Sequence, residues 1–140
     1  MATFPTSIRR LREDDRGFVI GHWLTSYWSD AVPRRKGKGG DVPRCDWKVP
    51  VKARVRVLLD EDVTLVACDP EEDARLFGFV CGGPAALHYV FVRPTRRRAG
   101  LGSELLDAIA RERGAPYDRR STTYVTRDWL AFRDAGRAAA

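Results

Sequence analysis

The sequence has little of what secreted, membrane-spanning or metal-binding proteins need. Its 140 residues include two histidines and three cysteines, and Cys45, Cys68 and Cys81 lack the close spacing of a metal site. No apolar run approaches the ~20 residues that span a bilayer, and the first residues contain no apolar segment of a secretory signal. We therefore expect reduced thiols in a cytoplasmic protein that has no membrane partner.

The sequence also has fewer acidic than basic residues. It contains 25 lysines and arginines but 19 aspartates and glutamates, which gives a net charge of +6. This excess favours anionic partners such as phosphates, a polyanionic cofactor or acidic proteins. Nucleic acid is an alternative that is disfavoured, because no basic stripe is interleaved with aromatic residues. With 44% hydrophobic residues the chain can bury a core, and its length predicts a single domain over residues 1–140.

The apolar spacing predicts alternating strands and helices. Short apolar runs predict strands at 7–12, 63–68, 76–81, 86–92 and 121–126. Apolar residues at helical spacing predict helices that begin near Asp14 or Asp15, at Leu101 and at residue 127.

Two segments in the first half of the chain are harder to assign. Residues 33–48 combine prolines and glycines with basic residues, which predicts an irregular loop. Residues 51–59 alternate like a strand, but Val51, Val55 and Leu58 also have the spacing of a helix. Periodicity alone leaves both structures open there.

A run of arginines and glycines, Arg93 to Ser103, separates the strand at 86–92 from the helix at Leu101. Backbone amides at a helix N-terminus bind anions, and glycine lets the backbone approach phosphate oxygens. The run does not match a P-loop. It also does not match the three-glycine dinucleotide motif, because Leu105 stands where the third glycine would be. We therefore predict a pyrophosphate site between Arg96 and Ser103.

The segment Arg97-Arg98-Ala99-Gly100-Leu101-Gly102 resembles motif A of the GNAT superfamily, the acyl-CoA-dependent N-acyltransferases. The order strand, two helices, three strands, helix, strand, helix is also similar to that of the family. The resemblance implies an α/β fold with a mixed, mostly antiparallel central sheet flanked by helices, with C-terminal strands short or missing. The resemblance also implies that residues 51–59 form a helix. The sequence from Trp23 to Tyr27 resembles that of small family members from bacteriophages and prophages.

The resemblance also implies roles for individual residues. The partners would be acetyl-CoA, as co-substrate, and an amine acceptor. Backbone groups of Phe91 and Val92 would bind the pantetheine arm. Arg97 would lead the motif, and the pyrophosphate would be held by the backbone amides of Arg98, Ala99, Gly100, Leu101, Gly102 and Ser103.

The catalytic half of the family pattern is less complete. A glutamate base that many members carry on the strand corresponds to Ala86, so His88 is the candidate base, since histidine titrates near neutrality. The tyrosine acid of the last helix corresponds to Phe132, which leaves Tyr124 as a substitute.

Two alternatives therefore stay open. The first is an N-acetyltransferase, and the second is a non-catalytic GNAT-fold module that binds protein or nucleic acid. An incomplete sheet edge at the C-terminal end invites pairing, which makes a homodimer one way to complete it.

Overall fold

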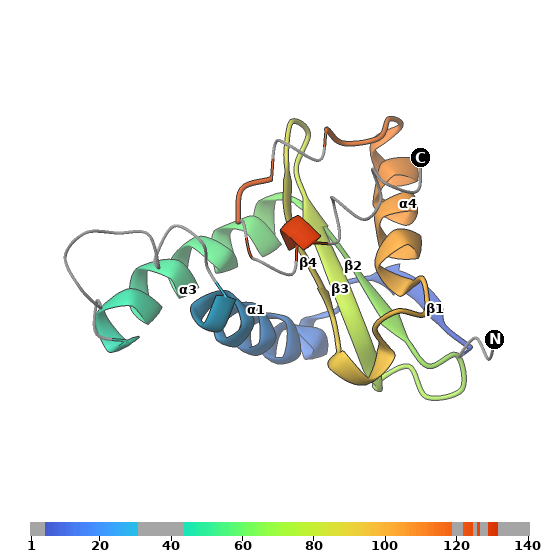
Figure 1. The fold of residues 1–140 in the computed structure, drawn as a ribbon, viewed down its shortest axis with the longest axis horizontal. Coiled ribbons are helices and arrows are strands. Elements are labelled where there is room, and N and C mark those ends of the chain that lie inside the picture. The colour runs from blue at the N-terminus through green and yellow to red at the C-terminus, as the bar shows by residue number, and fades with distance from the viewer. Residues whose placement is uncertain (1–4, 31–43, 119–121, 125, 127–128, 132–140) are drawn as a thin grey trace.

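The computed structural model describes residues 5–30, 44–118, 122–124, 126 and 129–131 (Figure 1). The strands are β1 (Ser7–Arg10), β2 (Val63–Cys68), β3 (Leu76–Gly82) and β4 (Leu87–Val92). The α-helices are α1 (Arg16–Asp30), α3 (Arg44–Glu61) and α4 (Leu101–Arg113). Two short 3-10 helices, η1 (Glu13–Asp15) and η2 (Pro94–Arg96), precede α1 and α4.

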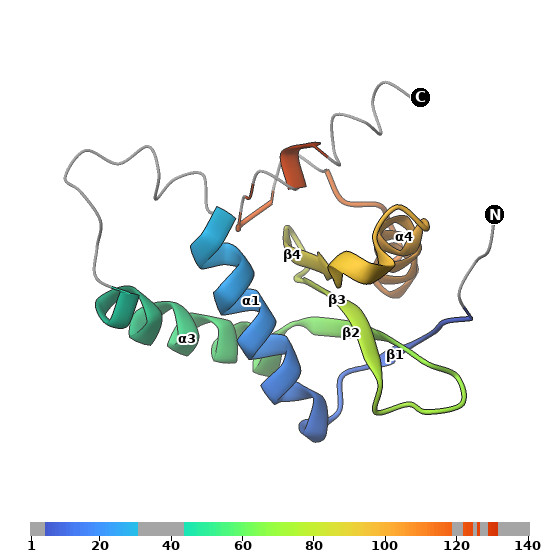
Figure 2. The same cartoon turned by 60° about the horizontal axis from the view of Figure 1, so that its bottom comes forward.

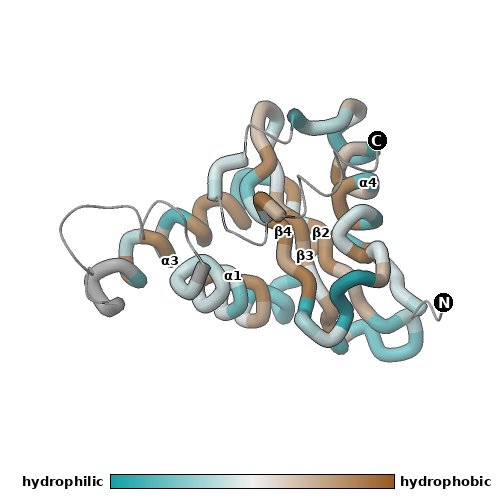
Figure 3. The backbone as a smooth tube through the Cα atoms, in the orientation of Figure 1, coloured by the Kyte–Doolittle hydropathy of each residue, from teal (hydrophilic) through white to brown (hydrophobic). Residues whose placement is uncertain are grey.

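The four strands form one antiparallel sheet in the order β1-β2-β3-β4, which separates two hydrophobic cores. Helices α1 and α3 lie on one face of the sheet and α4 lies on the other (Figure 2). Trp23, Val55 and Phe79 belong to the first core, and Val80 and Leu105 to the second. Hydrophobic residues gather in β2, β3 and β4 (Figure 3), because these strands are covered on both faces.

Helix α3 resolves the ambiguous segment and corrects one prediction. Residues 51–59 are helical because Val55 and Leu58 are buried, whereas Val57 is 38% exposed. The loop predicted over 33–48 is wrong for residues 44–48, which form the first turns of α3 even though Pro50 lies inside the helix. Residues 33–43 lie outside the described part of the chain.

Of the strand predicted over 121–126, the structure describes residues 122–124 and 126, of which 122–124 are bonded to the start of β4. Thr122 forms an isolated parallel bridge with Leu87. The amide of Thr123 donates to the carbonyl of Leu87 (2.9 Å), and the amide of Tyr124 donates to that of His88 (3.2 Å). Of the helix predicted over 127–135, Trp129, Leu130 and Ala131 are described and are helical, while Phe132 lies outside the described residues.

Two general findings concern the described residues alone. None of their helices has the length and apolar character required to cross a bilayer. Cys68 and Cys81 are buried free thiols, and burial raises the pKa of Cys81 to about 12, so this thiol is inert at neutral pH.

Asp15 ties the start of α1 to β1. Its carboxylate, in a residue only 4% exposed, accepts hydrogen bonds from both terminal guanidinium nitrogens of Arg9 (2.6 and 3.0 Å) and from the amide of Arg12 (2.7 Å). Burial raises the pKa of Asp15, but the Arg9 and Arg12 hydrogen bonds outweigh it and hold the pKa below its ordinary value.

Replacing Asp15 by asparagine is expected to lower the free energy of unfolding at pH 7 by about 3 kcal/mol, because Arg9 would keep a buried charge without its partner. A carboxylate with a lowered folded-state pKa stabilises the protein above its unfolded pKa of ~4 and loses this contribution as the pH falls through the folded value. In urea unfolding, the difference between the two proteins should therefore shrink on acidification. A difference that is independent of pH would contradict this account. Asp73→Asn, in an exposed ion pair with Arg12, serves as the control.

Candidate functional site

The outer edge of β4 opens into a pocket of about 400 Å³. At its first two residues β4 is bonded to the segment 122–124. Tyr89, Val90, Phe91 and Val92 line one wall of the pocket, and Thr126 and Trp129 line the opposite wall. The pocket therefore exposes the strand edge to a ligand.

The other end of the pocket is the turn that leads into α4. Arg98, Gly100 and Gly102 line it, together with Arg96, Arg97 and Leu101. Arg98 (φ 64°) and Gly100 (φ 83°) have left-handed backbone conformations, and such residues turn neighbouring amides towards one concave side. Because the first amides of a helix have no partner within it, and its dipole is positive there, this end of the pocket suits an anion.

Three arginines of the run have defined contacts, which explains why the turn is ordered. The Arg97 Nε donates to the carbonyl of Val92 (2.9 Å) and so ties the turn to the end of β4. The Arg96 guanidinium lies 4.4 Å from the ring centre of Phe77, and the Arg93 Nε donates to the carbonyl of Leu76 (2.7 Å). Arg96 and Arg93 therefore anchor the turn to β3, while the exposed Arg98 lines the pocket.

A serine and a tyrosine that were not identified from the sequence lie beside the open strand edge. The hydroxyls of Ser26 and Tyr89 are 2.5 Å apart, and both residues line the pocket. Tyr89 stacks on the buried Trp23, with ring centres 5.0 Å apart. Ser26 also donates to the carbonyl of His22 within its own helix (2.6 Å), so no sequence pattern indicated its contact with Tyr89.

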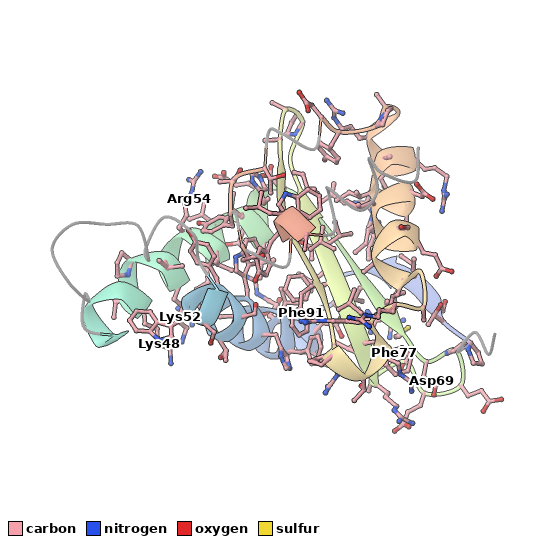
Figure 4. The ribbon with its side chains drawn as sticks, in the orientation of Figure 1. Lys48, Lys52, Arg54, Asp69, Phe77 and Phe91 are labelled. Atoms are coloured by element: carbon pink, nitrogen blue, oxygen red, sulfur yellow. The ribbon has the colours of Figure 1, made fainter. Side chains whose placement is uncertain are left out.

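Tyr124 is buried next to the pocket rather than in its wall. Its ring makes edge contacts with Trp23 (5.3 Å) and Tyr27 (5.0 Å). Burial raises the pKa of Tyr124, and the guanidinium of Arg54 on α3 opposes this shift (Figure 4). A phenol in this environment stays protonated at neutral pH, as a proton donor must.

Phe91 points from β4 towards α1 (Figure 4). Its ring stacks on that of His22 (4.9 Å) and meets the ring of Phe18 edge-on (6.4 Å). Burial and the nearby charge of Arg93 lower the pKa of His22, so this imidazole is neutral at pH 7. The side chain of Phe91 thus belongs to the core, and its backbone is the part that borders the pocket.

His88 lies outside the pocket wall and holds two other side chains. It is 8% exposed, its Nε2 lies 2.7 Å from Oδ2 of Asp62, and its Nδ1 lies 2.9 Å from Oγ1 of Thr123. His88 is the extra residue of a β-bulge, since Tyr89 pairs with Cys81 while Leu87 pairs with the next residue, Gly82.

Gly83 makes room for this arrangement. A Cβ at this position would lie 2.8 Å from Oδ2 of Asp62 and 3.2 Å from Nε2 of His88. Asp62 was missed by sequence reasoning, because it reads there as one of three acidic residues in a turn.

The predicted site residues thus fall into three groups. Val92, Arg97, Arg98, Gly100, Leu101 and Gly102 line the pocket together with Phe91. His88 and Tyr124 are not lining residues, and the amide of Tyr124 donates to the carbonyl of His88, next to the pocket residue Tyr89. Ala99, in the turn, and Ser103, in the first turn of α4, are not lining residues either.

No protein-family model matches the sequence, and no curated protein matches it. Solved structures do resemble the fold. A GCN5-related N-acetyltransferase from Rhodopseudomonas palustris has a TM-score of 0.57 at 18% identity, over 81% of this chain and 69% of that one. An acetyltransferase of the GNAT family from Xanthomonas campestris has a TM-score of 0.55 at 16% identity, over 99% and 86%. The PaiA N-acetyltransferase of Thermoplasma acidophilum, in complex with coenzyme A, has a TM-score of 0.53 at 17% identity, over 79% and 75%.

These structures show that the chain has the GNAT fold, which confirms the fold class expected from the sequence. The similarity to bacteriophage members stays a prediction.

Proposed function

We propose that this chain is an N-acetyltransferase that transfers the acetyl group of acetyl-CoA to a primary amine. The observation that carries the proposal is the continuous pocket between the open edge of β4 and the N-terminus of α4. Coenzyme A has an extended amide-bearing arm joined to a pyrophosphate, and the pocket offers a strand edge next to an anion site. The GNAT neighbour in complex with coenzyme A supports this assignment.

Each half of the coenzyme would meet a different part of the chain. Backbone groups of Phe91 and Val92 would bind the pantetheine arm, as a neighbouring strand would. Amides from Arg98 to Ser103 would bind the pyrophosphate at the positive end of α4. Arg97, which holds the Val92 carbonyl, would keep these two regions in register.

The chemistry requires the removal of a proton from the amine, whose pKa is ~10, and a donor for the departing thiolate. His88 is the proposed base and Tyr124 the proposed acid. The amide of Tyr124 donates to the carbonyl of His88, next to the pocket residue Tyr89, and the thioester would lie there. The net charge of +6 favours an acceptor that carries acidic groups over a polyamine.

Replacing Gly100 by valine is expected to weaken coenzyme A binding ~10-fold or more, as measured by isothermal titration calorimetry. A β-branched side chain at a φ of 83° strains the turn and displaces the amides that would hold the pyrophosphate.

Gly114→Val is the matched control, because Gly114 has a φ of 87° at the other end of the same helix. Gly114→Val should lose stability as Gly100→Val does, but it should bind coenzyme A with the affinity of the unaltered protein. Absence of coenzyme A binding by the unaltered protein, or equal affinities of the two variants, would overturn the assignment of the site.

A non-catalytic coenzyme-binding module is the second candidate. It is favoured by one observation: among the described residues that line the pocket there is no carboxylate and no imidazole. Binding of acetyl-CoA without transfer to any amine in a panel of acidic peptides and small amines would decide for this module.

A further inference from the structure

Asp62, His88 and Thr123 form a chain of hydrogen bonds that the coenzyme pocket does not include. Asp62 lies between α3 and β2, His88 on β4, and Thr123 after α4. The distances are 2.7 Å from Oδ2 of Asp62 to Nε2 of His88, and 2.9 Å from Nδ1 of His88 to Oγ1 of Thr123. Carboxylate, imidazole and hydroxyl in this order have the geometry of a group that orients a base, the base itself and the nucleophile that the base activates.

The hydrogen bonds assign the protons once the imidazole is taken as neutral, because each ring nitrogen donates or accepts according to the tautomer. A carboxylate only accepts, so Nε2 of His88 must donate to Asp62. In the neutral imidazole the other nitrogen, Nδ1, is then an acceptor. The hydroxyl of Thr123 must therefore donate its proton to Nδ1, and this is the direction that turns the hydroxyl oxygen into a nucleophile.

The three hydrogen-bonded residues differ in their exposure to solvent. His88 and Asp62 are sheltered, with side chains 10% and 18% exposed, whereas Thr123 is an exposed residue. The amide of Thr123 is held by the carbonyl of Leu87 (2.9 Å), so the hydroxyl is anchored from its own backbone. The base and the orienting group are thus sheltered, and the residue that carries the nucleophile is exposed.

Two features make room for this arrangement. The bulge at His88 breaks the regular alternation of β4 just where the imidazole meets Asp62 and Thr123. Gly83 leaves free the space between Asp62 and His88 that any side chain would fill. Simple packing of a strand histidine requires neither feature.

We propose that Thr123 is a nucleophile that accepts acyl groups from activated esters and thioesters, a reaction that shares His88 with the proposed acetyl transfer to amines but has a different acceptor, the hydroxyl of Thr123. Oγ1 of Thr123 forms a bond to the acyl carbon, and His88 takes the hydroxyl proton on Nδ1. The bond from the acyl carbon to the leaving sulfur or oxygen breaks, and the leaving group takes the proton back from the imidazolium. Water then attacks the threonine ester and releases the carboxylic acid.

The test uses p-nitrophenyl acetate and the full chain, so that it does not depend on coenzyme binding or on the amine acceptor. We expect release of p-nitrophenolate and an acetyl group on the peptide that contains Thr123, detected by mass spectrometry. Thr123→Ser should keep the reaction, while Thr123→Val, of nearly the same shape, should slow it ~10²-fold or more. Asp62→Asn should also slow it, because the imidazole loses its orienting acceptor.

A purely structural role of the three residues predicts another pattern. Thr123→Val would then lower the melting temperature but release p-nitrophenolate as fast as the unaltered protein, and this result would overturn the proposal. So would acetylation confined to lysines. Calorimetry with coenzyme A on the same variants separates the two proposals, since Thr123→Val should bind coenzyme A like the unaltered chain.

Discussion

Replacing Trp23 by alanine is expected to lower the free energy of unfolding by about 4 kcal/mol, a large fraction of the ~5–15 kcal/mol of a typical domain. Trp23 is completely buried in the core between the sheet and helices α1 and α3. Its ring stacks on Tyr89 (5.0 Å) and Phe79 (6.0 Å). Its removal leaves a cavity behind the pocket wall, because Tyr89 belongs to that wall. Urea unfolding followed by circular dichroism measures the loss.

Two further variants separate packing from nonspecific effects. Val49→Ala, at a position 72% exposed on α3, should change stability by less than about 0.5 kcal/mol. Trp23→Phe should cost much less than Trp23→Ala, because it keeps a stacking ring and removes an indole N–H that has no partner among the described residues. Equal losses for the phenylalanine and alanine variants would contradict a role in ring packing.

Replacing Gly78 by alanine is expected to destabilise the protein by about 3 kcal/mol and to weaken coenzyme A binding at the same time. A Cβ at Gly78 would lie 2.4 Å from the carbonyl oxygen of Phe91 and 3.2 Å from Cα of Val92. Both contacts are with backbone, so β3 and β4 must move apart where β4 borders the pocket. Unfolding in urea and titration with coenzyme A on the same sample measure both effects.

Gly21→Ala is a control for which the expected change in stability has the opposite sign. Gly21 lies inside α1, and a Cβ there would meet nothing within 4 Å. Since alanine favours the helix by up to ~1 kcal/mol over glycine, this variant should be as stable as the unaltered protein or more stable. Unchanged stability and affinity of Gly78→Ala would show that the strand spacing tolerates the change.

The elements that could be predicted from the sequence are those that local burial determines. The strand at 63–68 and the helix from Leu101 were found with nearly correct bounds, because their apolar residues face cores on fixed sides. The alternation at 51–59 left strand and helix open because Val57 faces solvent on a helix, and the helix that the family resemblance implied is confirmed. Only the burial of Val55 and Leu58 in the core shared with α1 makes that segment helical, and this packing is tertiary.

The residues of the candidate site also differ in how far they could be predicted from the sequence. The turn from Arg97 to Gly102 is contiguous, so residue types and their order were enough to predict an anion site. Ser26 and Tyr89 are 63 residues apart, and His88 is 26 residues from Asp62 and 35 from Thr123. Their contacts depend on strand register and on a bulge, which residue periodicity does not encode.

The position of β4 at the edge of the sheet also bears on how the protein behaves when it is concentrated. Backbone groups on the open stretch from Tyr89 to Val92 are a template to which the extended segment of another molecule can add. An arm of coenzyme A lying along that stretch would occupy the same groups. Under the function proposed above, the cofactor would then have a second physical effect: it would protect this strand edge against self-association, and coenzyme-free protein is expected to aggregate more readily.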